Sequence, residues 1–387
     1  MKAIIAGGGI AGAACAIALR KAGIEADIFE AFDRGAEGVG AFLTVAVNGL
    51  RALRAIDVDT AALGFETPRI ALYLADGQPL ADFDLGSAGG LRARTVRRDD
   101  LYRRLRDEAL HRGAGLHYGK KLADACDTGR AVQARFADGS SAEGDVLIGA
   151  DGLHSVTRRI IDAGAPQARY VGLLNLGGFA RGVPITGAAG TMHMFFGRRC
   201  FFAYTPAPDG TVWWFANPGQ RREPRPGELA GDDWRGRLLE LMDSDATPAC
   251  DLIRATPPLP APWATCDFPH VPHWRRGRMV IVGDAAHAAS PSSGQGASMA
   301  IEDAVALARC LRDGPSVEQA LAQYETLRRS RAEAVVAQGR RNGSGKTPPR
   351  FLRPVRDVML RFVFRDGGAG VEQGMRWVYD HPTEWEA

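Results

Sequence analysis

The sequence opens on an apolar run, Lys2–Ala6, that leads directly into the cluster Gly7-Gly8-Gly9-Ile10-Ala11-Gly12, and residues 10–22 are rich in alanine. This order predicts a buried strand, a tight turn and a helix. Glu25–Glu30 predicts a second strand, so the chain begins as a βαβ unit.

The glycine cluster has the spacing G-x-G-x-x-G at the turn from strand to helix. Gly7 permits the tight turn, Gly9 lets a pyrophosphate approach the backbone, and Gly12 allows close helix packing. Ile10 and Ala11 begin the helix, whose N-terminus favours negative charge. The pattern predicts a dinucleotide site, whereas the glycines alone would also suit a purely structural turn.

Glu30 stands at the end of the second strand, eighteen residues beyond Gly12. A carboxylate in this place accepts hydrogen bonds from the adenosine ribose hydroxyls. Because it would repel a 2′-phosphate, the site suits NAD or FAD better than NADP, and the motif does not separate NAD from FAD.

Two later apolar runs extend the same pattern. Asp145–Ala150 ends in Asp151-Gly152, and Met279–Val282 ends in Gly283-Asp284 before a helix expected over Ala297–Leu311. Strands that end in Gly or Asp before helices favour one sheet assembled from distant segments, in an α/β Rossmann-like domain.

Segments with a different sequence pattern interrupt this domain. Aromatic, alternating runs at 192–196, 200–204 and 212–215, separated by Gly, Pro and Asp, predict an inserted antiparallel β-sheet. The predicted division is 1–66, 91–169 and 270–312 for the first domain, 67–90 and 170–269 for the second, and 313–387 for a helical C-terminal region.

Three shorter expectations concern the connections. Residues 256–272, rich in proline, are expected to lead back to the first domain. After a helix to about Arg341, the run N-G-S-G-K-T-P-P is expected to be a flexible link. The amphipathic segment 350–365 is expected to pack as a helix on its own domain, with a partner or membrane face as the alternative.

Composition excludes several classes of protein. A net charge of +3, from 48 basic and 45 acidic residues, gives no strong field for nucleic acid or an anionic membrane. Six cysteines without a C-x-x-C pair predict neither a disulfide framework nor a metal site. With no apolar run of about 20 residues, no membrane span is expected, and the default is a cytoplasmic protein, monomer or homodimer.

The later glycine-rich segments together carry a resemblance. Residues 149–158, residues 283–287 with Pro291 and 294–296, and Glu302-Asp303-Ala304 resemble the second and third fingerprints of the class A FAD-dependent monooxygenases, the p-hydroxybenzoate hydroxylase-like family. The resemblance extends to Arg98 before a helix, and to Gly40 with residues 48–50. It implies FAD, and noncovalent binding is expected because no histidine or cysteine is placed to act as a flavin tether.

The resemblance implies roles that the physics of the residues supports. Asp284 can accept hydrogen bonds from the ribityl hydroxyls, and Asp151 supports the pyrophosphate region. Residues 294–297 enter a helix whose free N–H groups can face the flavin edge that gains negative charge on reduction. The expected cofactor residues are Gly7, Gly9, Ile10, Ala11, Gly12, Glu30, Arg98, Asp151, Asp284, Pro291, Gly294, Gln295, Gly296 and Ala297.

The implied activity is a hydroxylation. NADH or NADPH would reduce FAD, O₂ would form a flavin C4a-hydroperoxide, and one oxygen atom would pass to a small or natural-product aromatic or heteroaromatic substrate. A flavin oxidase or dehydrogenase on the same fold is the first alternative, and a non-enzymatic flavin-binding regulator is the second. A halogenase is disfavoured because Trp213-Trp214 lacks the W-x-W-x-x-P spacing.

The substrate site is less well marked. Phe195, Phe201, Trp213 and Phe215 are candidates for an apolar pocket, although aromatic residues at strand spacing are more often sheet core. His193 and Tyr204 are weak candidates for orienting or deprotonating a phenol-like hydroxyl, since satisfied buried polar residues would look the same.

Overall fold

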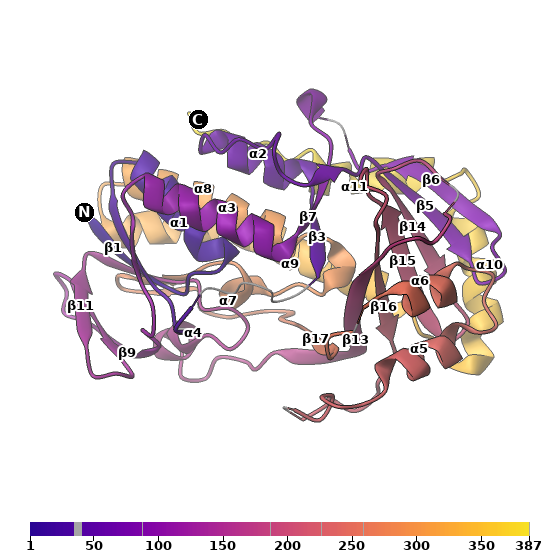
Figure 1. The fold of residues 1–387 in the computed structure, drawn as a ribbon. Coiled ribbons are helices and arrows are strands. Elements are labelled where there is room, and N and C mark those ends of the chain that lie inside the picture. Colours follow the sequence, from indigo (N-terminus) through magenta and orange to yellow (C-terminus); the bar gives the residue numbers. More distant parts are fainter. Residues whose placement is uncertain (35–40, 87, 186, 226, 258, 387) are drawn as a thin grey trace.

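The computed structural model describes residues 1–34, 41–86, 88–185, 187–225, 227–257 and 259–386 (Figure 1). A six-stranded sheet in the order β18-β19-β12-β1-β2-β8 organises the first part of the fold. Its strands are β1 (Lys2–Ala6), β2 (Glu25–Phe29), β8 (Gly115–His117), β12 (Val146–Gly149), β18 (Arg275–Arg276) and β19 (Met279–Ile281). The five strands from β19 to β8 run parallel, as expected for an α/β domain.

Distant segments meet in this sheet as the sequence predicted, because β1 pairs with both β2 and β12, and β12 pairs with β19. Helices α1, α3 and α8 lie together beside it (Figure 1). The helices of this part are α1 (Ile10–Lys21), α2 (Val47–Ala55), α3 (Arg98–His111), α4 (Val156–Ile161), α7 (Asp284–His287) and α8 (Gly296–Asp313). Two small three-stranded sheets complete this part of the fold. The first contains β9 (Leu122–Asp127), β10 (Val132–Phe136) and β11 (Ser141–Gly144). The second contains β3 (Phe42–Val45), β4 (Phe65–Glu66) and β7 (Arg94–Arg97).

A seven-stranded sheet forms the second part, in the order β17-β13-β16-β15-β14-β5-β6. Its strands are β5 (Arg69–Leu74), β6 (Pro79–Asp84), β13 (Arg169–Ala180), β14 (Thr191–Phe196), β15 (Cys200–Pro206), β16 (Val212–Pro218) and β17 (Trp263–Asp267). The three aromatic runs are the neighbouring strands β14, β15 and β16, and they pair antiparallel as predicted. The sheet also holds a parallel pair, β5 with β14, where the segment around 67–90 joins the later strands.

The two faces of this sheet have different neighbours. Phe202, Tyr204 and Trp214 share one face, which is covered by α5 (Trp234–Met242) and α6 (Ala249–Ala255). Phe201 and Phe215 share the opposite face with Phe42 of β3, so this face turns toward the first part of the molecule.

The C-terminal region is helical, with α9 (Val317–Ser344), α10 (Arg353–Val363) and α11 (Ala369–Tyr379). Short 3₁₀ turns lie at Ala88–Gly90, Pro291–Ser293 and Arg350–Leu352. Helix α10 packs Leu360 against β5 and β6 of the seven-stranded sheet and leaves Val358 and Phe362 exposed, and Phe351 in the preceding 3₁₀ turn is also exposed. None of the described helices is long and apolar enough to cross a membrane.

Two connections differ from the expectation. The stretch 256–272 is more than a return path, because residues 263–267 form β17 and extend the sheet beside β13. The expected flexible link is structured instead: α9 continues to Ser344, and Lys346 is buried. In both cases, contacts with residues far along the chain outweigh the local preference of Gly, Ser and Pro for irregular structure.

Candidate active site

The glycine turn between β1 and α1 is shaped by close packing at two of its glycines. Gly7 has φ +101°, and a Cβ atom there would lie 2.5 Å from the carbonyl oxygen of Ala150. A Cβ atom at Gly12 would lie 2.0 Å from the carbonyl oxygen of Gly7. At Gly9 it would meet no atom within 4 Å. Gly7 and Gly12 are therefore needed by the fold itself, while Gly9 leaves open space beside the start of α1, which no side chain caps.

Glu30 follows β2 and lies beside this turn. Its Oε2 atom accepts a hydrogen bond from the backbone N–H of Gly8 at 2.7 Å, and its Oε1 atom accepts one from Phe32 at 3.0 Å. Each carboxylate oxygen has a second lone pair, so the side chain is fixed in place and still able to accept from a ligand hydroxyl.

Asp151 follows β12, and its carboxylate is already engaged by the start of α4. It accepts hydrogen bonds from the backbone N–H groups of Val156 and Thr157 at 2.8 and 2.9 Å, and from the hydroxyl of Ser155 at 2.5 Å. The Cα atom of Asp151 also lies against Gly7. Asp151 therefore fixes the loop on which the glycine turn rests.

Asp284 is the first residue of α7 and follows shortly after β19. Its side chain is exposed to water, although many protein atoms lie around it. Burial raises the pKa of its carboxyl group, and Asp303 adds to this effect, while His287 and Arg98 oppose it. Arg98, the first residue of α3, thus lies close enough to act on Asp284 electrostatically. An exposed acid within electrostatic reach of a cation is suited to a polar ligand.

The loop before α8 contains the other expected flavin residues. Pro291–Ser293 form a 3₁₀ turn, Gly294 has φ +63°, and Gln295 precedes the first helical residue, Gly296. A Cβ atom at Gly294 or Gly296 would meet nothing within 4 Å. No side chain caps α8. The first N–H groups of this helix, at Gly296 and Ala297, thus border open space and carry the positive end of its dipole.

Gln295 and Asn48 connect this loop to α2. The Nδ2 atom of Asn48 donates to Oε1 of Gln295 at 2.9 Å. Two buried polar atoms of the pair, Asn48 Oδ1 and Gln295 Nε2, have no hydrogen-bond partner among the described residues. Buried polar atoms without partners are uncommon in folded proteins, and they mark a place that a polar ligand or water can complete.

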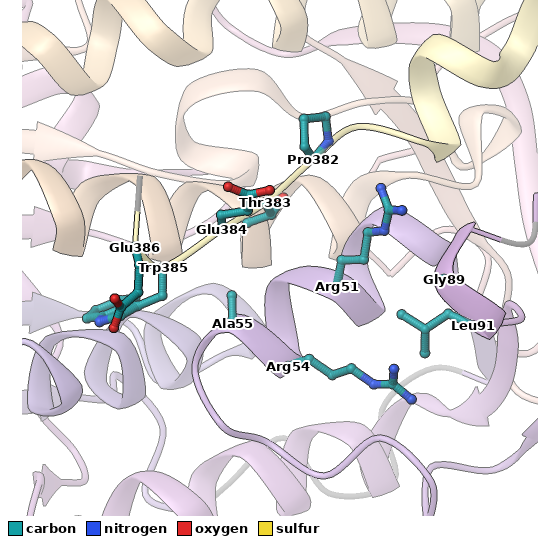
Figure 2. Close-up of a pocket in the computed structure, with 10 residues that line it drawn as sticks. All are labelled: Arg51, Arg54, Ala55, Gly89, Leu91, Pro382, Thr383, Glu384, Trp385 and Glu386. Carbon is teal, nitrogen blue, oxygen red and sulfur yellow. The ribbon is translucent and has the colours of Figure 1, made fainter.

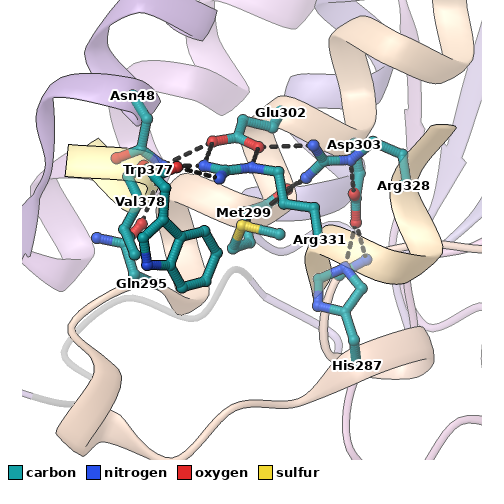
Figure 3. Close-up of polar contacts among 11 residues, drawn as sticks. Asn48, His287, Gln295, Met299, Glu302, Asp303, Arg328, Arg331, Trp377 and Val378 are labelled. Carbon is teal, nitrogen blue, oxygen red and sulfur yellow. Dashed lines mark hydrogen bonds and ion pairs between the residues drawn. The ribbon is translucent and has the colours of Figure 1, made fainter. Parts of the chain in front are cut away.

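A buried ionic network lies beneath the loop (Figure 3). Arg328 of α9 donates from Nη1 to Glu302 at 2.6 Å and from Nε to Asp303 at 2.8 Å. Arg331 binds both oxygens of Glu302 at 2.8 Å. Asp303 also accepts from the backbone N–H of Gly283 at 2.9 Å and lies 2.5 Å from Nε2 of His287. The network therefore ties α7 and α8 to α9, and Arg331 extends it to the carbonyl groups of Trp377 and Val378 in α11.

The charges in this network are mutually stabilised. Burial alone would raise the pKa of Asp303, but His287 and Arg328 outweigh it and hold that pKa below its usual range. The pKa of Glu302 falls to about 2, because Arg328 and Arg331 likewise outweigh burial. His287, whose pKa is raised by Asp303 in spite of burial, holds the loop through that carboxylate.

The candidate substrate residues fall on both faces of the seven-stranded sheet. Phe201, Trp213 and Phe215 lie on the face that meets Phe42, with the Phe42 ring 5.5 Å from Trp213 and 6.1 Å from Phe215. Phe195 lies on the opposite face, in the cluster under α5 and α6. One cavity on one face cannot be lined by all four residues.

His193 and Tyr204 also lie on the face covered by α5 and α6, next to Phe195. Their rings stack at 4.8 Å, and Nδ1 of His193 is 3.2 Å from the hydroxyl of Tyr73. Burial lowers the pKa of His193 and raises that of Tyr204 to about 12. Both groups are therefore held neutral at neutral pH in a stacked cluster.

A separate cavity of about 620 Å³ lies between α2 and the C-terminal tail (Figure 2). Its lining includes Arg51, Arg54 and Trp385, and none of the expected cofactor or substrate residues. It is therefore distinct from the loops described above.

Two residues of the buried ionic network were missed by the sequence analysis: Arg328 and Arg331. The two arginines are three residues apart on α9, a spacing that places them on one side of the helix. In a chain with 48 basic residues this spacing gives no signal, since their carboxylate partners are more than twenty residues away.

The arrangement of the described residues fits FAD. Open space borders Gly9, Gly294 and Gly296, two helix N-termini lack side-chain caps, and a recessed aspartate lies between them. Gln295 and Asn48 supply buried polar atoms with no partner among the described residues. Of the segments in the resemblance, Gly40 lies outside the described residues.

Comparison with known proteins agrees with this arrangement. Residues 1–339 match the family described as FAD binding domain. The chain is 33% identical to aurachin C monooxygenase/isomerase of Stigmatella aurantiaca, over 94% of each chain. It is 30% identical to the FAD-dependent urate hydroxylase of Klebsiella pneumoniae, over 88% of this chain and 89% of the other.

Among solved structures, Klebsiella pneumoniae HpxO in complex with FAD and uric acid superposes with a TM-score of 0.81 and 28% identity, over 97% of this chain and 95% of the other. The predicted α/β fold, the FAD cofactor and the resemblance to the class A enzymes are thereby confirmed. The chain belongs to the FAD-binding family of flavin-dependent aromatic hydroxylases.

Proposed function

We propose that this chain is an NAD(P)H-dependent monooxygenase that adds one oxygen atom of O₂ to a small aromatic or heteroaromatic substrate. The overall change is substrate, NAD(P)H, H⁺ and O₂ to hydroxylated substrate, NAD(P)⁺ and water. The observation that carries the proposal is the aromatic sheet face, Phe201, Trp213 and Phe215, turned toward the part of the fold that holds the FAD residues. Relatives over nearly the whole chain are a monooxygenase and a hydroxylase.

Bound FAD would accept the hydride and activate the oxygen. The chain's own task is to hold it. We assign the pyrophosphate to the turn at Gly7, Gly9 and Gly12 with Ile10 and Ala11, and the adenosine ribose to Glu30. Further contacts are assigned to Arg98, Asp284, Pro291, Gly294, Gln295, Gly296 and Ala297, with Asp151 as support.

The helix N-terminus at Gly296 supplies preorganised N–H groups for negative charge that develops on a reduced flavin. The network of Glu302, Asp303 and Arg328 holds that helix against α9, so the donors need no rearrangement during the reaction. No second G-x-G-x-x-G occurs in the chain, so the nicotinamide cofactor would bind without a Rossmann site of its own. Cytoplasmic location and monomer or homodimer assembly stay predictions from the sequence.

The proposal is tested by isotope transfer. The FAD-loaded enzyme is incubated with NADH or NADPH, ¹⁸O₂ and a panel of hydroxylated aromatic and heteroaromatic compounds, and products are analysed by mass spectrometry. One ¹⁸O atom per product molecule supports a monooxygenase. NAD(P)H consumption with H₂O₂ and no labelled product would identify the oxidase alternative.

Asp284→Asn is expected to weaken FAD binding and to stabilise the FAD-free protein. Loss of a charge-assisted hydrogen bond costs about 1.5–3 kcal/mol, or about one to two decades in affinity. The raised pKa of Asp284 means that the folded state binds its proton more tightly than the unfolded state, so stability falls as pH rises from the ordinary value of 3.8 through the raised pKa. The variant should lack that fall.

The measurements for Asp284→Asn are FAD fluorescence titration and thermal unfolding of the FAD-free protein between pH 3 and 8. Asp76→Asn is the control, because Asp76 is exposed in the turn after β5 and accepts a hydrogen bond from the nearby backbone N–H of Gln78. Native FAD affinity in Asp284→Asn would remove this residue from the proposed site.

Phe215→Ala is expected to raise the ratio of H₂O₂ to hydroxylated product several-fold, because a wetter cavity diverts reducing equivalents from the substrate. Phe195→Ala is the matched control, since it removes the same ring from the opposite face of the same sheet. Both are measured on FAD-loaded protein with a verified substrate. Equal coupling in the two variants would place the cavity elsewhere.

A further inference from the structure

Lys346, just beyond the end of α9, lies on the aromatic face of the seven-stranded sheet. Its side chain is buried, with 7% of the residue exposed. The Nζ atom lies 4.1 Å from the centre of the Phe201 ring and 5.8 Å from that of Phe215. It donates to Oδ1 of Asn217 at 2.6 Å. Because Phe201 and Asn217 are paired across β15 and β16, all three neighbours belong to the face that meets Phe42.

The segment that carries Lys346 also touches the loop before α8. Gly339 packs against Ser293, where an added Cβ would lie 2.9 Å from the serine Cβ. Asn342 donates to the carbonyl oxygen of Ser292 at 3.2 Å. Four residues later the chain has reached Asn217 on the sheet. Lys346 therefore lies where the expected flavin loop and the aromatic face come together.

The ammonium group of Lys346 has more N–H donors than hydrogen-bond partners among the described residues. A lysine has three N–H donors and no acceptor, and among the described residues its hydrogen-bond partner is the neutral amide of Asn217. No carboxylate in the part of the chain that the structure describes forms an ion pair with it. A buried cation with one neutral partner is costly unless an anion joins it.

Burial lowers the pKa of Lys346 to about 7. Cys200 of β15 is the titratable neighbour that acts on it, and burial raises the pKa of that thiol well above its usual range, so the thiol is neutral at pH 7. The ammonium form is thus present at neutral pH and is available to a ligand that brings negative charge.

We propose that Lys346 binds an anionic oxygen of the substrate, and that the enzyme takes aromatic or heteroaromatic acids: rings that bear a carboxylate or an ionised hydroxyl. The ring would lie against Phe201 and Phe215, with the anionic oxygen on Nζ. This assignment rests on the proposed function and names the substrate class for it. Lys346 is a binding residue here, and no proton transfer is assigned to it.

A purely structural role, in which Lys346 only anchors the C-terminal region to Asn217, makes a different prediction. An anchor would influence stability and would not distinguish a charged ligand from a neutral ligand of the same shape. Ligand discrimination therefore separates the two roles.

The first experiment measures binding to the oxidised, FAD-loaded enzyme without NAD(P)H, through the change in flavin absorption. The probes are salicylate, anthranilate and 4-hydroxybenzoate, each paired with its neutral carboxamide, together with urate. For the native enzyme, at least one carboxylate should bind tenfold or more tightly than its carboxamide. Lys346→Met should weaken that probe 10- to 100-fold and change the carboxamide less than threefold.

Two further variants complete this experiment. Lys346→Arg should retain the preference for the anion, because it keeps the charge. Lys121→Met removes an exposed lysine far along the chain and should bind every probe as the native enzyme does. An undiminished preference in Lys346→Met, or no preference and no binding for every anionic probe on the native enzyme, would overturn the proposal.

The second experiment observes the lysine directly. The chain has only five lysines, at 2, 21, 120, 121 and 346, so an NMR spectrum of enzyme labelled with ¹³Cε-lysine is simple, and Lys346→Met identifies the signal of interest. Its titration midpoint should move upward when the preferred anion saturates the site, because a nearby negative charge favours the ammonium form. No change in that signal on saturation would overturn the assignment.

The monooxygenase activity and the anion site at Lys346 can be disproved independently. Labelled product from ¹⁸O₂ without charge discrimination at Lys346 leaves the monooxygenase intact and removes the lysine. Charge discrimination without any labelled product keeps the anion site and removes the hydroxylation.

Discussion

Replacing Arg328 with Met is expected to lower the free energy of unfolding by about 3–5 kcal/mol, the cost of leaving buried carboxylates without their cation. Arg328 is 3% exposed, and its partners Glu302 and Asp303 are 1% and 0% exposed. Arg331 would still neutralise Glu302, whereas Asp303 would lose its arginine and keep its contacts with His287 and the N–H of Gly283. Differential scanning calorimetry or urea titration measures the loss.

Arg329→Met is the matched control, one residue along the same helix. Its guanidinium pairs with Glu325 and Glu333 at the partly exposed surface, where ion pairs contribute about 0–1 kcal/mol. Arg329 also donates to the carbonyl groups of Val271 and Pro272, so the comparison sets a buried arginine with buried carboxylate partners against a partly exposed arginine of the same helix. A similar small effect in both would mean that the network does not hold the fold.

The acid side of the stability profile gives a second readout. Glu302 has a pKa of about 2 against an ordinary value of 4.5, so the network contributes stability above pH 4.5 that is lost as pH falls toward 2. Because Arg328 is the largest of the groups that lower this pKa, Arg328→Met should flatten the fall. An unchanged slope would show that Arg331 and Asn48 keep this pKa low without Arg328.

Much of the FAD-binding half could be predicted from the sequence because its signals are local. A glycine turn, a following helix and a strand-end acid lie within thirty residues, and Gly12 is constrained by the carbonyl oxygen of Gly7 in the same turn. Apolar runs ending in Gly or Asp predicted one sheet built from distant segments, and β1, β12 and β19 do share a sheet. Such features depend on the period and the turn chemistry of one segment at a time.

The substrate side could be predicted only in part because its decisive contacts are long-range. Alternation shows that Phe201 and Tyr204 point to opposite faces of β15, but it does not say which face α5 and α6 cover. Lys346 stands in a run whose composition favours a flexible link, yet it reaches Asn217 across 129 positions. Long-range contacts that bury a polar residue in a loop produce no periodic sequence pattern from which they could be predicted.

Gly9→Ala is expected to lower FAD affinity at least tenfold, about 1.4 kcal/mol, without destabilising the FAD-free protein. The methyl group would meet no protein atom within 4 Å, so the folded chain tolerates it, and it would occupy the space through which a pyrophosphate approaches the backbone. Fluorescence titration gives the affinity, and thermal unfolding of the FAD-free protein gives the stability.

Gly12→Ala, by contrast, should destabilise the FAD-free protein, so comparing the two variants separates a glycine needed for the cofactor from one needed for the fold. Its Cβ would lie 2.0 Å from the carbonyl oxygen of Gly7, so the backbone must shift, at a cost of about 1–3 kcal/mol or more in the FAD-free protein itself. Gly374→Ala, in α11 with no atom within 4 Å, controls for the added methyl group and should change neither quantity adversely. Native affinity in Gly9→Ala would show that this glycine does not face the cofactor. Equal destabilisation in Gly9→Ala and Gly12→Ala would show that the turn needs all its glycines for folding, and that the open space beside α1 is not reserved for a ligand.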